Sequence, residues 1–117
     1  MPTYVDGFVI PILKKNIPAY RLLSRDAGKI WREHGALEYR ECVGDDITAS
    51  GHFPKQLRLK RGETVIFAWV TYKSRRHRDR VNKKVMSDPR ITGVDASKIP
   101  FDSRRMLYGG FTTIVEL

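Results

Sequence analysis

Four side chains in the sequence carry groups that could move protons or position a substrate. They are Asp6, His34, His77 and Tyr108, and carboxyl, imidazole and phenol groups are common general acids and bases. Asp6 stands out because it lies in the apolar run YVDGFVIPIL, where burial would raise the pKa of an unpaired carboxyl. A structural interpretation stays open, in which Asp6 is bonded to a neighbouring Arg or Tyr.

Each of these histidines also has a structural explanation. His34 directly precedes Gly35, the expected end of a helix, where a histidine interacts favourably with the helix dipole and free carbonyls. His77 lies at the border of a predicted helix, where it could be bonded to the main chain. With His52, they show no HxH or HExxH spacing, so neither a metal nor haem is expected. No phosphate loop or nucleotide fingerprint is present, and no cofactor is predicted.

Glycines inside predicted strands indicate a second kind of site. Gly7 interrupts the first strand, and Gly109 and Gly110 interrupt the last, positions that mark a bulge or leave room for another group. We therefore expect a hollow where these strands meet, with Tyr4, Asp6, Phe8 and Tyr108 around it. The predicted ligand-binding set is Tyr4, Gly7, Asn82, Gly109 and Gly110.

Charge is concentrated in YKSRRHRDRVNKKVM, residues 72–86, within a chain of net charge +9. One interpretation is a surface, formed by Arg75, Arg76, Arg80 and Lys83, that binds RNA or another acidic partner. The segment lacks stacking aromatics and any recognised nucleic-acid motif. Val81 and Val85, four residues apart, instead predict an amphipathic helix with its charges in solvent. Nucleic-acid binding is the less favoured interpretation.

The elements that position these residues follow from residue patterns. Runs of β-branched and aromatic residues predict strands at 4–13, 37–43, 64–72 and 106–115. Helices are predicted at 17–34 and, capped by Ser74, through Ser87. Residues 44–63 form a long loop, and 91–105 an irregular segment. The order β-α-β-β-α-β predicts one ferredoxin-like α+β domain over residues 1–117, an antiparallel sheet with two helices on one face.

The strand at 64–72 is apolar on both faces, although two helices can cover only one face of the sheet. We therefore expect a homodimer in which two sheets pack together, a dimeric α/β barrel. Glu38, Arg40 and Glu41 alternate between faces and suit an edge strand that resists aggregation. Cys42 is the single cysteine and is expected to be a small buried side chain. No signal peptide or membrane span is evident, so a cytoplasmic location is expected.

The segments that carry a family resemblance are VDGFVI, KIWREHGALEYREC, LKRGETVIFAWVTYKSRRHRDRVNKKVMSDPR and PFDSRRMLYGGF. They resemble the YbaA-like family of small uncharacterised bacterial proteins, which is placed in the dimeric α/β-barrel superfamily. The resemblance covers nearly the whole chain, with a departure at residues 49–53. It implies the fold and the dimer, but no activity and no catalytic residues.

The favoured function is a small-molecule-binding protein or minor enzyme with a pocket between sheet and helices. Enzyme activity rests only on analogy with the superfamily. The alternative is an interaction protein that binds RNA or another acidic partner through the basic helix.

Overall fold

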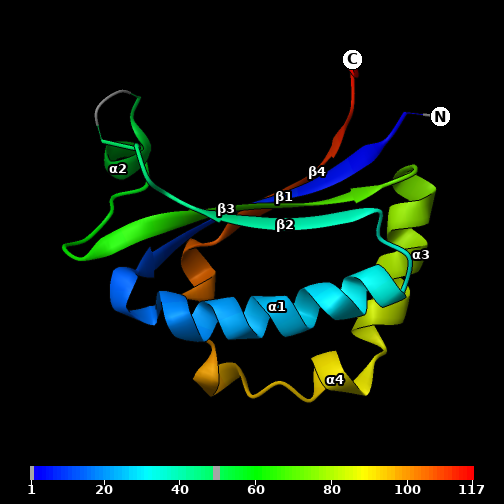
Figure 1. The fold of residues 1–117 in the computed structure, drawn as a ribbon, viewed down its shortest axis with the longest axis horizontal. Coiled ribbons are helices and arrows are strands. Elements are labelled where there is room, and N and C mark those ends of the chain that lie inside the picture. Colours follow the sequence, from blue (N-terminus) through cyan, green and yellow to red (C-terminus); the bar gives the residue numbers. More distant parts are fainter. Residues whose placement is uncertain (1, 49–50) are drawn as a thin grey trace.

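The computed structural model describes residues 2–48 and 51–117. Four strands form one antiparallel sheet in the order β2-β3-β1-β4, and two long helices, α1 and α3, lie on one side of it (Figure 1). The strands are β1 (Tyr4–Leu13), β2 (Glu38–Val43), β3 (Glu63–Tyr72) and β4 (Leu107–Thr112), and the helices are α1 (Ile17–Glu33) and α3 (Arg75–Met86). This is the ferredoxin-like α+β arrangement.

The two central strands form the floor of the core because alternate residues point to opposite faces of a sheet. Ile10 and Ile66 are register partners in β1 and β3, and both are buried on the side that carries the helices. From α3, Val81 and Val85 complete a cluster with Tyr72. Full burial of each such aliphatic side chain stabilises the fold by about 1.5–3 kcal/mol.

Local signals fix where the helices begin and end. The Ser74 side chain accepts a hydrogen bond from the His77 main-chain N–H at 3.1 Å, which confirms the predicted cap. Gly35 follows α1 with φ +116°, a conformation that favours glycine. Midway along α1, Gly28 is buried against the ring of Tyr39, which brings the helix close to β2.

The structure contains short helices that the sequence pattern did not reveal, some of them within the predicted loop and irregular segment. They are η1 (Lys14–Asn16), α2 (Phe53–Gln56), α4 (Pro89–Thr92), η2 (Ala96–Lys98) and η3 (Ser103–Arg105). Residues 49 and 50 of the predicted loop lie outside the described residues. The chain from α4 to η3 passes beneath α1 before it returns to β4 (Figure 1). The last strand ends at Thr112, three residues before its predicted end at Val115.

Arg105 joins this returning segment to the loop before β3. Its guanidinium contacts the two carboxylate oxygens of Glu63 at 2.6 and 3.1 Å and also donates to the carbonyl oxygen of Arg58 at 3.1 Å. The Glu63 side chain is only 7% exposed. This bidentate ion pair therefore holds η3 against the start of β3.

The sheet face opposite α1 and α3, here called the open face, is only partly covered. At one end Val65 and Pro11 are buried, and α2 lies on this side of the sheet (Figure 1). Elsewhere Phe67, Leu107 and Phe111 are 50%, 57% and 62% exposed. The prediction that Cys42 is buried is wrong: it is exposed, because it is the register partner of Phe67 on an edge strand.

Within residues 2–48 and 51–117, no helix is both long enough and apolar enough to cross a bilayer.

Candidate functional site

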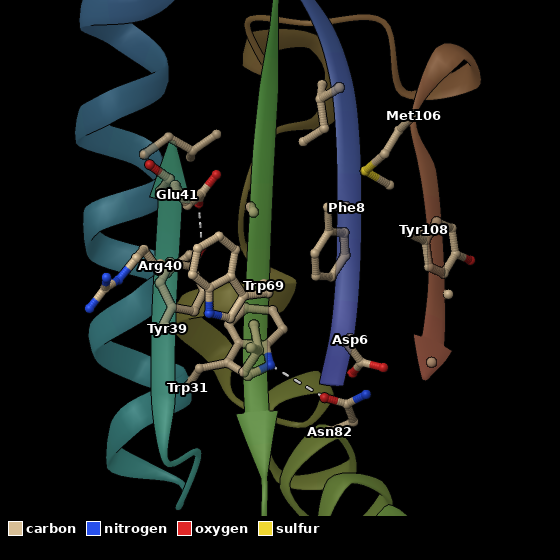
Figure 2. A pocket seen from close by; sticks show the side chains of 18 of the residues that line it. Asp6, Phe8, Trp31, Tyr39, Arg40, Glu41, Trp69, Asn82, Met106 and Tyr108 are labelled. Atoms are coloured by element: carbon tan, nitrogen blue, oxygen red, sulfur yellow. Dashed lines mark hydrogen bonds between the residues drawn. The ribbon is translucent and has the colours of Figure 1, made fainter. Parts of the chain in front are cut away.

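A cavity of about 480 Å³ lies between the sheet and the helices. Side chains of α1, β1, β2, β3, α3 and β4 border it, together with Phe101 and Met106 from the segment that passes beneath α1. Figure 2 shows Phe8, Trp31 and Tyr108 among its aromatic walls. The volume falls in the range of small-molecule sites, which are typically apolar with a few polar groups.

The first polar group of the cavity centres on Asp6. Its carboxylate accepts a hydrogen bond from Arg78 Nη1 at 3.0 Å, and the Arg78 guanidinium lies 4.9 Å from the centre of the Tyr4 ring. Burial raises the pKa of Asp6 above its ordinary value of 3.8, and the attraction of Arg78 only partly opposes this. A buried carboxyl with a raised pKa is suited to proton transfer.

At this end of the cavity, Asn82 of α3 is hydrogen-bonded to one residue of α1 and one of β3. Its side-chain oxygen accepts hydrogen bonds from Trp31 Nε1 at 3.3 Å and from the Tyr72 hydroxyl at 3.2 Å; the bond from Trp31 is drawn in Figure 2. Burial raises the pKa of Tyr72, which keeps its hydroxyl protonated as a donor. Asn82 thus joins α1, α3 and β3 beside the ligand space.

The second polar group centres on Glu41, on the side of β2 that faces α1. Its Oε2 accepts a hydrogen bond from the Tyr39 hydroxyl at 2.6 Å, and its Oε1 accepts one from the Tyr20 hydroxyl. Burial and the adjacent Glu41 charge raise the pKa of both tyrosines. Phe101 packs edge-on against Tyr20, with 5.7 Å between ring centres. One carboxylate is therefore surrounded by phenols and aromatic rings.

Part of the predicted site borders this cavity. Asp6, Asn82, Tyr108, Gly109 and Gly110 line it. Tyr108 is 73% exposed, and its ring stacks on Phe8 with 6.1 Å between centres, so the cavity is open to solvent beside β4.

Gly7 and Tyr4 do not line the cavity. Gly7 is the register partner of Gly109, and a Cβ added at Gly7 would lie 3.4 Å from the Phe111 ring, which occupies the expected hollow on the open face. At Gly110 an added Cβ would meet the Tyr4 hydroxyl. Adjacent residues of a strand face opposite sides of the sheet. The Phe111 ring therefore fills the space beside Gly7 and Gly109, and the Tyr4 ring fills the space beside Gly110 on the other side.

Neither candidate histidine lines the cavity. His34 Nε2 lies 2.9 Å from Asp88 Oδ2, which ties the end of α1 to the residue that caps α4. His77 Nδ1 accepts a hydrogen bond from the Lys73 main-chain N–H at 3.0 Å. Burial lowers the pKa of His77, and nearby Lys73, Arg80 and Lys84 lower it further. His77 thus has the main-chain contact that its structural interpretation proposed, whereas His34 contacts the Asp88 carboxylate and no side-chain bond from it to a carbonyl is seen in the described residues.

Apart from Arg78, the basic residues of α3 do not border the cavity. Arg75, Arg76, Arg80 and Lys83 are exposed on its outer surface, and none of them borders the cavity. In residues 2–48 and 51–117, no group of three or more His, Cys, Asp or Glu side chains is placed to hold a metal ion.

Sequence reasoning missed Glu41 and its aromatic surroundings. The sequence pattern explained Glu41, together with Glu38 and Arg40, only as charges on alternate faces of an edge strand that resists aggregation. The structure separates them: Arg40 lies over the Trp69 ring at 5.8 Å and pairs with Glu38 at 3.5 Å, whereas Glu41 faces α1. The available signal was the i, i+2 spacing of Tyr39 and Glu41, which places both on one strand face.

Residues 3–103 match the family described as "Protein of unknown function (DUF1428)". The chain belongs to this family. Among its relatives, the uncharacterised protein YbaA of Escherichia coli strain K12 is 38% identical over 115 residues, which cover 97% of each chain. YbaA of Shigella flexneri matches to the same extent. These DUF1428 relatives confirm the family resemblance and assign no activity.

One solved structure shares the fold across the full length of both chains. It is described as a dimeric ferredoxin-like protein from an uncultured marine organism and matches with a TM-score of 0.70 at 8% sequence identity. At such low identity the similarity shows the fold alone. The ferredoxin-like prediction is thereby confirmed.

Proposed function

We propose that the protein binds a small organic molecule in the cavity between the sheet and the helices. The observation that carries this proposal is the cavity itself, about 480 Å³ in volume and bordered by aromatic and aliphatic side chains. Its few polar groups are gathered around Asp6 and Glu41, an arrangement typical of sites that orient a largely apolar ligand.

The chemistry that this site could add to binding is proton transfer through Asp6. The Asp6 side chain is only 10% exposed, its carboxyl has a raised pKa, and it borders the ligand space. Arg78, at 3.0 Å, would stabilise the ionised form after proton loss. In this reaction class Asp6 is the proposed acid or base, whereas Tyr108 beside the opening and Asn82 would position the ligand.

A neutral fluorescent probe, N-phenylnaphthylamine, tests binding in this cavity. Ala27 borders the cavity from α1, so Ala27→Phe should fill the space and abolish the fluorescence increase that the wild type shows. Ala19→Phe places the same ring at an exposed site on the same helix and should bind the probe normally. Equal binding by both variants would contradict the proposed site. Native mass spectrometry of the purified protein would detect a retained ligand.

We further propose that two copies pack through their open faces to form a dimeric α/β barrel. Phe67, Leu107 and Phe111 are at least half exposed on that face, and large exposed apolar patches mark interaction surfaces. The structural neighbour that shares the fold is described as dimeric, which supports the same assembly. The face that a second copy would cover is the one that α1 and α3 leave open.

Light scattering after size-exclusion chromatography tests the dimer. Wild type should elute as a dimer, and Phe111→Glu as a monomer, because a charge would be buried without a partner. Leu22→Glu is the matched control, since Leu22 is 64% exposed but lies on α1. A monomeric wild type at micromolar concentration would contradict the open-face assembly.

The alternative function is binding of RNA or another acidic partner through α3. Its supporting observation is that Arg75, Arg76, Arg80 and Lys83 are exposed, and no acidic side chain of the described residues forms an ion pair with any of them. Their joint replacement by Gln should abolish a salt-sensitive RNA mobility shift and leave probe binding intact. Absence of RNA retention by wild type at low salt would exclude this function.

A further inference from the structure

The two polar groups of the cavity differ in how their charge is balanced. At one end Asp6 is paired with Arg78, whose Nε also lies 2.9 Å from Asp79 Oδ1. At the other end, no basic nitrogen of the described residues lies within 4.0 Å of the Glu41 carboxylate. Arg40, the adjacent residue, also borders the cavity, but it belongs to the open-face side of β2, where its guanidinium lies over Trp69 and pairs with Glu38 at 3.5 Å. The uncompensated charge of the cavity is therefore negative.

Glu41 retains acceptor capacity although both of its oxygens are bonded. A carboxylate offers about four lone-pair positions, and the hydroxyls of Tyr20 and Tyr39 use one on each oxygen. The side chain is only partly buried, and it borders the cavity. A ligand group that donates hydrogen bonds can therefore reach it without displacing the tyrosines.

Aromatic rings surround this carboxylate and favour a positive charge beside it. Besides the two tyrosines, Phe101 contacts Tyr20 at 5.7 Å and Trp31 contacts Tyr39 at 6.2 Å between ring centres, and all four residues border the cavity. The faces of aromatic rings attract cations, most strongly where the cation is shielded from water. A carboxylate with aromatic walls is a recognition site for ammonium groups.

We propose that the ligand is an organic amine, with its ammonium group at Glu41 and an apolar body along the aliphatic and aromatic walls. This inference rests on the proposed function, because it assigns a ligand class to the same cavity. A carboxylate ligand would instead face the unpaired charge of Glu41. The chain's net charge of +9 does not oppose the amine at this site, because its exposed basic side chains on α3 are screened over about 8 Å at physiological ionic strength.

Isothermal titration calorimetry with three ligands of one shape tests the head group. The probes are naphthylethylamine, naphthylethanol and naphthylacetate, which present a cation, a neutral hydroxyl and an anion at neutral pH. Wild type should bind the amine about tenfold or more tightly than the alcohol, as expected for a charge-assisted hydrogen bond, and the acetate most weakly. A preference for the acetate, or equal affinity for amine and alcohol, would overturn the assignment.

Glu41→Gln should remove the preference for the amine while affinity for the alcohol is retained. Glu33→Gln is the matched control, because Glu33 is an exposed carboxylate that pairs with Arg90 outside the cavity, and it should behave as wild type. Persistence of the amine preference in Glu41→Gln would refute the role of this carboxylate. If that variant does not fold, the wild-type series with the three probes still decides the assignment.

The outcomes also separate this inference from the proposed function. Binding of N-phenylnaphthylamine or naphthylethanol without a preference for the amine would leave the cavity as a ligand site and overturn the amine assignment. Failure of all four compounds to bind wild type would overturn both proposals.

Discussion

Replacement of Gly28 by alanine should destabilise the protein, although alanine is the better helix former. Gly28 is buried in the interior of α1, and an added Cβ would lie 2.6 Å from Cδ1 and 2.7 Å from Cε1 of the Tyr39 ring. These distances are far below van der Waals contact, so the ring must move. The change therefore perturbs the wall of the cavity as well as the contact between α1 and β2.

The expected loss combines three terms. Alanine gains about 1 kcal/mol of helix propensity over glycine, whereas overpacking of a well-filled site costs about 1–3 kcal/mol. Movement of Tyr39 also weakens its 2.6 Å hydrogen bond to the Glu41 carboxylate, and bonds of this charged kind contribute about 1.5–3 kcal/mol. We expect a net loss of about 3 kcal/mol, or about 10 °C in melting temperature for a domain of this size.

Urea unfolding followed by circular dichroism, at one fixed protein concentration, measures this loss. Asp26→Ala, at an exposed position of the same helix, should change the unfolding free energy by no more than about 0.5 kcal/mol. In a Tyr39→Ala background the obstacle is absent, so Gly28→Ala should stabilise by about 1 kcal/mol. An equal loss in both backgrounds would show that contact with the Tyr39 ring is not the cause.

Three further predictions concern ion pairs and titrating groups. Arg105→Gln should lower the unfolding free energy by about 2 kcal/mol because it leaves the Glu63 carboxylate unpaired. Arg104→Gln, at a side chain 89% exposed, should change the unfolding free energy by less than about 1 kcal/mol, and equal losses in the two variants would contradict this reasoning. Because the pKa of His77 is lower in the folded protein than its ordinary value of 6.5, the unfolding free energy should fall as the pH drops from 6.5 through the folded pKa. His77→Gln should flatten that part of the pH–stability curve, and an unchanged slope in this variant would exclude His77 as the source of the pH dependence. A pH titration followed by NMR of the Asp6 carboxyl carbon should give a pKa above 3.8 in wild type. Arg78→Gln should raise this pKa further because it removes the opposing cation, and a wild-type value at or below 3.8 would contradict burial as the dominant cause.

The elements of the fold were predictable because their signals are local. Ser74 and Gly35 mark helix ends through their own side chain or backbone conformation, and the run of β-branched and aromatic residues at β3 indicates a strand. That β1 and β4 are neighbours, as the pairing of Gly7 with Gly109 shows, also followed from the expected fold. These features depend on residues close in sequence or on a simple rule of topology.

The cavity was only partly predictable because it depends on packing between distant residues. Tyr20 and Glu41 meet only when α1 is set at one rotation over β2, a rotation that the close contact at Gly28 fixes. The expected hollow at Gly7 is occupied by Phe111. No periodicity in the sequence reveals which aromatic ring occupies the space that a glycine leaves empty.

The placement of the two tryptophans provides an intrinsic fluorescence signal for ligand binding and another for assembly. Trp31 borders the cavity and donates to Asn82. Trp69 also borders the cavity, but it belongs to the open-face side of β3, and its indole donates to Glu38 at 2.7 Å. Because the chain has only these two tryptophans, each single replacement by Phe leaves one emitter on one side of the sheet. A ligand in the cavity should alter the emission of Trp31, and assembly of two copies that of Trp69, so the two events can be followed separately without a label.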